Sequence, residues 1–73
     1  MTVRIGLIGA GRIGAMHAAH LTALRTPEGE PAVRLSIVDA VPGQAAAVAA
    51  RTGAEPFPTV RALLDDGVDG LVV

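Results

Sequence analysis

Three glycines near the N-terminus have the spacing of a phosphate-binding loop. Gly9, Gly11 and Gly14 form the pattern Gly-x-Gly-x-x-Gly, which directly follows an apolar run and opens a helical pattern. In such a loop the first glycine permits a tight turn, the second leaves room for a pyrophosphate, and the third allows close packing of the helix. The N–H groups of Arg12 and Ile13, at the start of the helix, would point at the phosphates. The pattern predicts a dinucleotide site; the alternative is a tight turn without a ligand.

An acidic residue completes this pattern. Asp39 closes the second apolar run, 25 residues after Gly14. A carboxylate there can accept hydrogen bonds from both ribose hydroxyls of an adenosine, and it would repel a 2′-phosphate. We therefore expect NAD rather than NADP, although Arg12 and Arg51 could act as distant partners of a 2′-phosphate and leave NADP open. The alternative role of Asp39 is to cap the following turn or helix. For the Arg12 side chain we expect exposure to solvent or a loose contact with a phosphate.

Two histidines and a group of acids are the other candidates for chemistry. His17 and His20 lie one helical turn apart, a spacing that could place both on one metal ion, but no third ligand of a suitable type is close in the sequence. We expect two partly buried helix histidines, with a packing role for His17, and neither a metal site nor a catalytic residue. Asp65, Asp66 and Asp69 are expected to face solvent rather than bind a cation.

The composition excludes several classes of function. The chain has 73 residues, a net charge of −1 and no cysteine, and its six basic residues are all arginines scattered along the sequence. Without lysine there is no Schiff base and no P-loop lysine, and without a clustered basic face we expect no nucleic-acid partner. The longest unbroken apolar run, residues 45–50, is far below the ~20 residues that a membrane span needs. We expect a cytoplasmic protein with no membrane partner.

Short apolar runs alternate with helical patterns along the whole chain. Strands are predicted at 3–8, 33–38, briefly at 55–57 and again from residue 70. Helices are predicted from 12 to about 25, at 44–51 and at 60–65. The order β-α-β-α-β-α-β predicts an α/β fold with a parallel sheet. Since Val73 ends the chain inside an apolar run, we expect a partial Rossmann fold truncated within its fourth strand.

Local residue patterns predict the buried face of the first helix and the ends of the helices. The stripe of Ile13, His17, His20 and Leu24, flanked by Met16 and Leu21, is predicted to be the buried face of the first helix. Pro42 fits the first turn of the second helix, and Gly53 its C-terminal stop. Thr59 is predicted to cap the third helix.

Taken together, these segments resemble the glucose-fructose oxidoreductase/inositol dehydrogenase family (Gfo/Idh/MocA), most closely its inositol 2-dehydrogenase side. The resemblance covers the whole chain. It is carried by Arg-Ile-Gly-Leu-Ile-Gly-Ala-Gly-Arg-Ile-Gly at 4–14, His17-Ala18, Val38-Asp39, and the Leu-Leu-Asp-Asp and Val-Asp-Gly segments between 62 and 73. It implies that residues 1–73 are the N-terminal half of an NAD(P)-binding Rossmann domain, followed in the parent protein by a substrate domain absent from this chain. It also implies hydride transfer between a nicotinamide cofactor and a sugar or polyol hydroxyl carbon.

The resemblance carries over only cofactor-binding positions: Gly9, Gly11, Arg12, Ile13, Gly14 and Asp39. The family's catalytic Glu-Lys-Pro motif and later histidine lie beyond this sequence, so the 73-residue chain alone is predicted to be inactive. We expect the parent protein to be a homo-oligomer. Two alternatives are a non-catalytic dinucleotide-binding sensor or regulator, and another Rossmann class such as an amino-acid-pathway dehydrogenase or a flavin protein; the His17-Ala18 pair argues against the latter.

Overall fold

Strands and helices alternate through the computed structural model, which describes residues 2–41 and 43–73. The strands are β1 (Val3–Ile8), β2 (Val33–Val38), β3 (Glu55–Pro56) and β4 (Gly70–Val72). The helices are α1 (Arg12–Ala23), α2 (Gln44–Thr52) and α3 (Val60–Asp66). The predicted elements are confirmed with shifts of one or two residues at their ends. The expectation for Pro42 falls outside the described residues.

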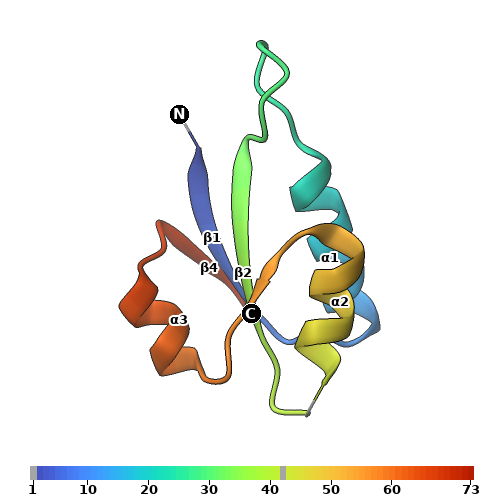
Figure 1. Ribbon diagram of the computed structural model, residues 1–73, viewed down its shortest axis with the longest axis vertical. Coiled ribbons are helices and arrows are strands. Elements are labelled where there is room, and N and C mark those ends of the chain that lie inside the picture. The colour runs from blue at the N-terminus through green and yellow to red at the C-terminus, as the bar shows by residue number, and fades with distance from the viewer. Residues whose placement is uncertain (1, 42) are drawn as a thin grey trace.

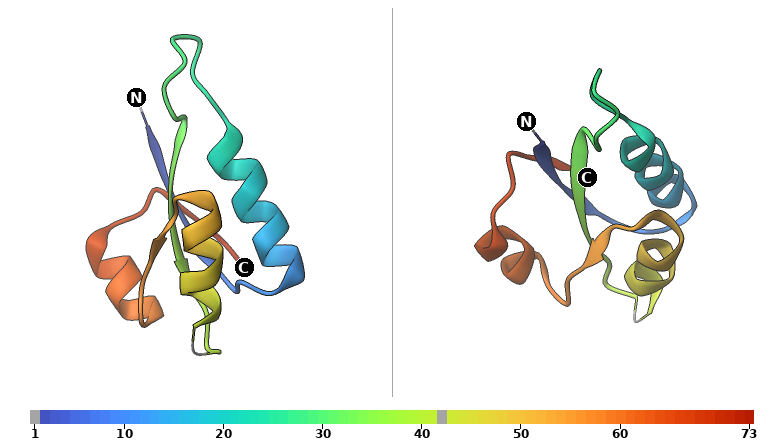
Figure 2. Two further views of the ribbon diagram at one scale, coloured as in Figure 1. Left: turned by 45° about the vertical axis from the view of Figure 1, so that its right-hand side comes forward. Right: turned by 45° about the horizontal axis from the view of Figure 1, so that its top comes forward.

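The four strands form one parallel sheet in the order β3-β2-β1-β4. β1 and β2 pair along their whole length, from Val3 opposite Val33 to Ile8 opposite Val38, and β4 pairs with the other side of β1. Helices α1 and α2 cover one face of the sheet and α3 covers the opposite face (Figures 1 and 2). After β3 the chain crosses to the far side of β1 and adds β4 there. The strand order therefore reverses at β1, as it does in a partial Rossmann fold.

Both faces of the central strands are packed against helices. Leu7 of β1, Ile37 of β2, Val48 of α2 and Leu63 of α3 are the largest side chains that are almost fully buried. Gly6 lets α3 approach β1, because a Cβ atom there would lie 2.6 Å from Cδ2 of Leu63. The core thus combines a few fully buried branched side chains with close approach at glycine.

Helix α1 packs on the sheet through Ala18 and in part Leu21, so the predicted buried stripe is wrong except at its Leu21 flank. Ala18 is fully buried, while Ile13 is 66% exposed and Met16 is 49% exposed. His17 and His20 are also exposed rather than partly buried. Ala18 lies on the opposite side of the helix from this stripe, where a short side chain brings the helix backbone close to the strands. The larger side chains of Ile13 and Met16 are left on the outer surface.

Hydrogen bonds of single side chains fix the start of α3 and the segment that leads from it to β4. The Thr59 hydroxyl accepts a hydrogen bond from the Ala62 N–H at 3.0 Å, which confirms the predicted N-cap. After the helix, the Asp69 carboxylate accepts from the Arg4 N–H at 2.8 Å, and the Asp69 N–H donates to the Arg4 carbonyl at 2.6 Å. Asp65, Asp66 and Asp69 are exposed, as expected. Asp69 thus has a structural role, because it holds the start of β4 against β1.

Gly53 ends α2 in the left-handed conformation, with φ = 81°, as predicted. No helix within the described residues has the length and apolar character required to cross a bilayer.

The packing face of α1 can be tested with two neighbouring alanines. Ala18→Leu should lower the free energy of unfolding of the full-length protein by about 1–3 kcal/mol, because the larger side chain overfills the interface between α1 and the sheet. Ala19→Leu is the matched control, since Ala19 is exposed and a surface change stays within about 0.5 kcal/mol. Denaturant unfolding of both variants measures the difference. Equal stability of the two would contradict the observed packing face.

Candidate functional site

The glycine loop connects β1 to α1 at the carboxyl end of the sheet, and its three glycines differ in their surroundings. Gly9 has φ = 106°, a conformation that other residues rarely adopt. A Cβ atom on Gly14 would lie 2.1 Å from the Gly9 carbonyl oxygen, so only glycine lets the helix begin this close to the strand end. Gly11 is more open: its nearest neighbour would be Nε2 of Gln44 at 3.4 Å. The space above Gly11 is therefore available to a ligand.

The backbone donors of the loop divide into two groups. The Gly9 N–H donates to the Val38 carbonyl at 2.8 Å, and the Ala10 N–H donates to Oδ2 of Asp39 at 2.5 Å. These two bonds tie the loop to the end of β2. Arg12, the first residue of α1, begins the turn whose N–H groups have no partner within the helix. The loop thus presents its remaining donors at the positive end of the α1 dipole, an arrangement suited to an anion.

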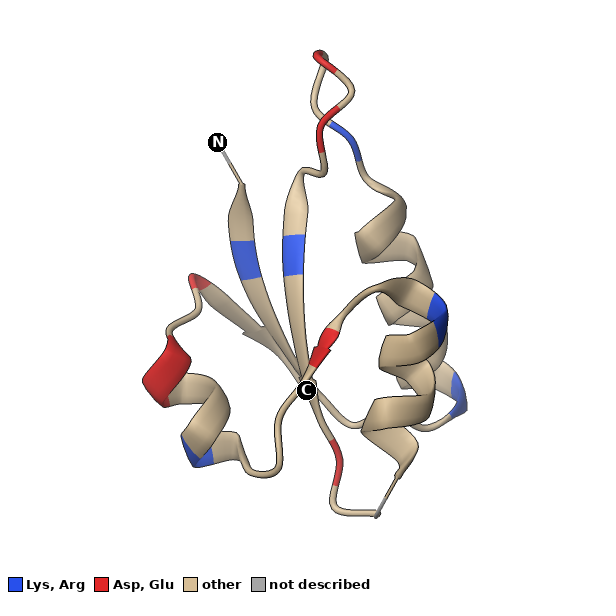
Figure 3. Ribbon diagram, in the orientation of Figure 1, with Lys and Arg blue, Asp and Glu red and all other residues tan. Residues whose placement is uncertain are grey.

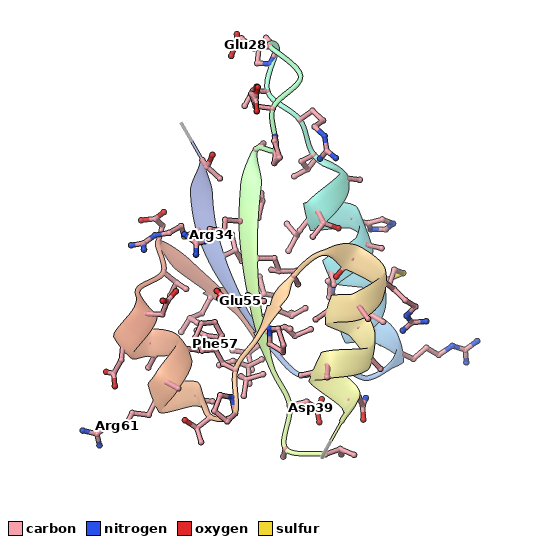
Figure 4. The ribbon with its side chains drawn as sticks, in the orientation of Figure 1. Glu28, Arg34, Asp39, Glu55, Phe57 and Arg61 are labelled. Carbon is pink, nitrogen blue, oxygen red and sulfur yellow. The ribbon has the colours of Figure 1, made fainter. Side chains whose placement is uncertain are left out.

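Asp39 receives a hydrogen bond on each carboxylate oxygen. Besides the Ala10 N–H on Oδ2, the Val41 N–H donates to Oδ1 at 2.7 Å. These bonds, that of Ala10 first and that of Val41 second, lower the pKa of Asp39 below its ordinary value, against a smaller opposing effect of burial. A carboxylate offers about four acceptor positions, so about two remain for hydroxyl groups of a ligand. Figure 4 shows Asp39 at the end of β2, near the start of α2.

A cavity of about 470 Å³ lies on the other side of the loop, between α1 and the end of β4. Its walls are the end of β1, the glycine loop, the first turns of α1 and the last residues of the chain. They include Leu7, Ile8, Gly9, Gly11, Arg12, Ile13, Gly14, His17, Val72 and Val73. In parallel α/β sheets, ligands bind at the carboxyl ends of the strands where the strand order reverses, and this cavity occupies that position.

The structure thus brings all six predicted cofactor residues to one end of the sheet. Gly9, Gly11, Arg12, Ile13 and Gly14 line the cavity, and Asp39 is joined to the loop through Ala10. The Arg12 side chain is exposed, as expected. His17 also lines the cavity, which the sequence interpretation missed because it placed this residue on the packing face. Its position one turn beyond Gly14 was the signal that could have placed it there.

Other features of the surface do not converge on this site. A larger cavity of about 830 Å³ lies at the amino ends of β2 and β3, and its walls carry charges of both signs, such as Arg25 and Glu28. Arg34 and Glu55 form an exposed ion pair on neighbouring strands, with 3.7 Å between their charged atoms. Basic and acidic residues are scattered over the fold in Figure 3. No group of three residues able to hold a metal ion occurs in the described part of the chain.

Substitutions at two glycines of the loop should affect the stability of the fold and the binding of the dinucleotide separately. Gly14→Ala should lower the free energy of unfolding of the full-length protein by about 1–3 kcal/mol, because its methyl group meets the Gly9 carbonyl. Gly11→Ala should keep the stability within about 0.5 kcal/mol but weaken dinucleotide binding roughly tenfold or more, because its methyl group occupies the space of the pyrophosphate. Denaturant unfolding and calorimetric titration measure the two effects. A stable Gly14→Ala variant would contradict the close contact.

The hydrogen bonds of Asp39 predict a dependence of stability on pH. Because the pKa is lower in the folded chain than the ~3.9 of an unfolded aspartate, the ionised carboxylate stabilises the fold at neutral pH. This contribution is lost as the pH falls from about 4 through the lowered pKa. Wild type should therefore be more stable than Asp39→Asn at neutral pH, and the difference should shrink as the pH falls below about 4. Denaturant unfolding across this range measures it, and a difference that does not change with pH would refute the role of the charge.

Comparison with known proteins identifies the family. Residues 3–73 match the family model described as "Oxidoreductase family, NAD-binding Rossmann fold" (GFO_IDH_MocA). Among solved structures, the chain is similar to a myo-inositol dehydrogenase from Corynebacterium glutamicum, with 36% sequence identity and a TM-score of 0.76 over 97% of this chain and 20% of that chain. It is also similar to a putative myo-inositol dehydrogenase from Sinorhizobium meliloti, with 36% identity and a TM-score of 0.74 over 96% of this chain and 20% of that one. No match was found among the curated proteins.

The chain spans about a fifth of the length of these two structures. The family match, in contrast, extends over nearly all of its residues and includes the glycine loop and the end of β2. The strand order, the glycine loop and these similarities agree with one another, and this chain belongs to the Gfo/Idh/MocA family of oxidoreductases with an NAD-binding Rossmann fold.

Proposed function

We propose that residues 1–73 form the N-terminal half of the dinucleotide-binding domain of an NAD-dependent oxidoreductase. The observation that carries this proposal is the pairing of Ala10 with the Asp39 carboxylate, which holds an acceptor for ribose hydroxyls beside a glycine loop with free N–H donors. The family match supports a nicotinamide dinucleotide as the cofactor. When bound, this cofactor would supply the acceptor or donor of a hydride ion.

Each part of a dinucleotide has a counterpart along the carboxyl end of the sheet. The adenosine ribose would be bound by Asp39 at the end of β2, through the acceptor positions that Ala10 and Val41 leave free. The pyrophosphate would lie over Gly11 on the N–H groups that begin α1. The nicotinamide half would then enter the cavity between α1 and β4. This order follows from the strand order β2-β1-β4, because the dinucleotide crosses the sheet at the point of reversal.

The charge of Asp39 favours NAD over NADP. Like any aspartate, it is ionised at neutral pH, where it would repel a 2′-phosphate. The residues that follow, Ala40 and Val41, offer no positive charge to compensate. Arg12, which is exposed beside the cavity, and Arg51 remain the two arginines that could attract a 2′-phosphate in the alternative.

We infer that the whole protein transfers hydride between this cofactor and a hydroxyl carbon of a sugar or polyol, with an inositol-like compound as the leading candidate. The support is the similarity to two structures described as myo-inositol dehydrogenases. Hydride transfer also requires a positioned substrate and a group that moves the hydroxyl proton. Parts of the protein beyond these 73 residues would provide both, so this chain alone should bind the cofactor without turnover. Cytoplasmic location and a homo-oligomeric state remain predictions from the sequence.

The proposal is tested on the full-length protein with both dinucleotides and a panel of polyols. We expect reduction of NAD, seen in the near-ultraviolet absorbance of the reduced nicotinamide, with myo-inositol or a related cyclic polyol, and tighter binding of NAD than of NADP. Asp39→Ala should weaken NAD roughly 10- to 100-fold, the effect of lost hydrogen bonds to a charged group. It should weaken NADP less, because the repulsion of the 2′-phosphate is removed as well.

Two results would contradict the proposal in different ways. Equal affinity of the wild-type protein for NAD and NADP would refute the role of Asp39 in cofactor choice. Binding of NAD without turnover of any sugar or polyol would instead favour a non-catalytic sensor or regulator on the same fold.

A further inference from the structure

His17 is the one imidazole on the wall of the cavity between α1 and β4, as far as the described residues extend. It lies in the second turn of α1, just beyond Gly14, and its side chain is exposed. Within the described part of the chain it has no hydrogen-bond partner. An exposed polar side chain needs no explanation on a free surface, but this one faces the space where the strand order reverses.

The other walls of this cavity are mostly apolar or backbone. Ile13 is 66% exposed on the same side of α1, and Leu7 and Val72 line the opposite wall from β1 and β4. Ligand pockets typically combine such apolar walls with a few polar groups that fix the orientation of the ligand. Besides the backbone of the loop, the polar side chains here are those of Arg12 and His17. Arg12 is at the loop itself, whereas His17 is one turn farther along the helix.

Asp39 and His17 lie on opposite sides of the glycine loop, so they would meet different parts of a dinucleotide. Asp39 is at the end of β2 and His17 faces β4, so β1 and the glycine loop lie between them. A dinucleotide whose adenosine ribose is bound at Asp39 and whose pyrophosphate lies on the loop must extend its remaining half toward His17.

We propose that His17 is a cofactor-binding residue that makes a hydrogen bond to the nicotinamide half of the dinucleotide. The inference rests on the proposed function and adds a contact that the glycine loop and Asp39 do not supply. An imidazole can donate a hydrogen bond from one nitrogen and accept at the other, so it suits the ribose hydroxyls of that half. Together with the exposed face of Ile13, it would hold the nicotinamide ribose in a defined position.

The test compares NAD with ADP, which has the adenosine and both phosphates but lacks the nicotinamide half. In the full-length protein, His17→Ala should weaken NAD binding roughly three- to tenfold, the effect of one lost hydrogen bond. Its affinity for ADP should stay unchanged, because ADP does not reach His17. His17→Gln should retain part of the NAD affinity, since an amide can also donate a hydrogen bond. Calorimetric titration of each variant with both ligands gives the affinities.

His20→Ala is the matched control. It removes the same side chain from the exposed surface of the same helix, and His20 does not line the cavity. This variant should bind NAD and ADP as the wild-type protein does. A change that His17→Ala shares with His20→Ala would reflect a general effect on the helix and would overturn the proposal.

The remaining outcomes also decide the question. Unchanged NAD affinity in His17→Ala, or an equal loss for NAD and ADP, would overturn the role of His17 while leaving the proposed function intact. If the wild-type protein binds ADP but not NAD, the nicotinamide half has no site here and this inference fails. If it binds neither ligand, the proposed function fails and this inference with it.

Discussion

The hydrogen bond from the Ala10 N–H to the Asp39 carboxylate is the constraint on which the arrangement of the site depends. It joins the glycine loop after β1 to the end of β2, beside a second bond from Gly9 to Val38. The loop is thereby held in place before any ligand arrives, which reduces the entropy that binding must overcome. The same bond favours the ionised form of Asp39, so the contact that holds the loop also favours the charge of the site.

Close approach of backbones is the second constraint, and it determines which side chains are available to the site. Gly14 lets α1 begin against the Gly9 carbonyl, and Ala18 continues this contact one turn later. With its small residues against the sheet, α1 turns Ile13 and His17 toward the cavity. The residues that pack α1 against the sheet therefore also determine which of its side chains line the cavity.

The sequence predicted the elements and the loop well, because their signals are local. The strand limits at 3–8 and 33–38 follow from continuous apolar runs, and Thr59 and Gly53 mark helix ends through their own backbone and side-chain chemistry. The packing face of α1 was predicted wrongly because the large apolar residues were taken as the buried ones. A helix that must lie very close to a sheet buries alanine and glycine instead, and hydrophobic patterning gives these residues little weight. As a result, His17 was predicted to lie on the buried face of α1, whereas it lines the cavity.

The two edges of the sheet differ in their ability to accept another strand. β3 is only two residues long, and Pro56 within it has no N–H to offer a further neighbour. Its other residue, Glu55, places a charge at the same edge, and short, charged, proline-containing strands protect a sheet against unwanted pairing. β4 has neither proline nor charge in Gly70–Val72 and pairs with β1 on one side. The β4 edge is therefore the one suited to a further strand, so enlargement of the sheet is favoured in the direction of the proposed nicotinamide half.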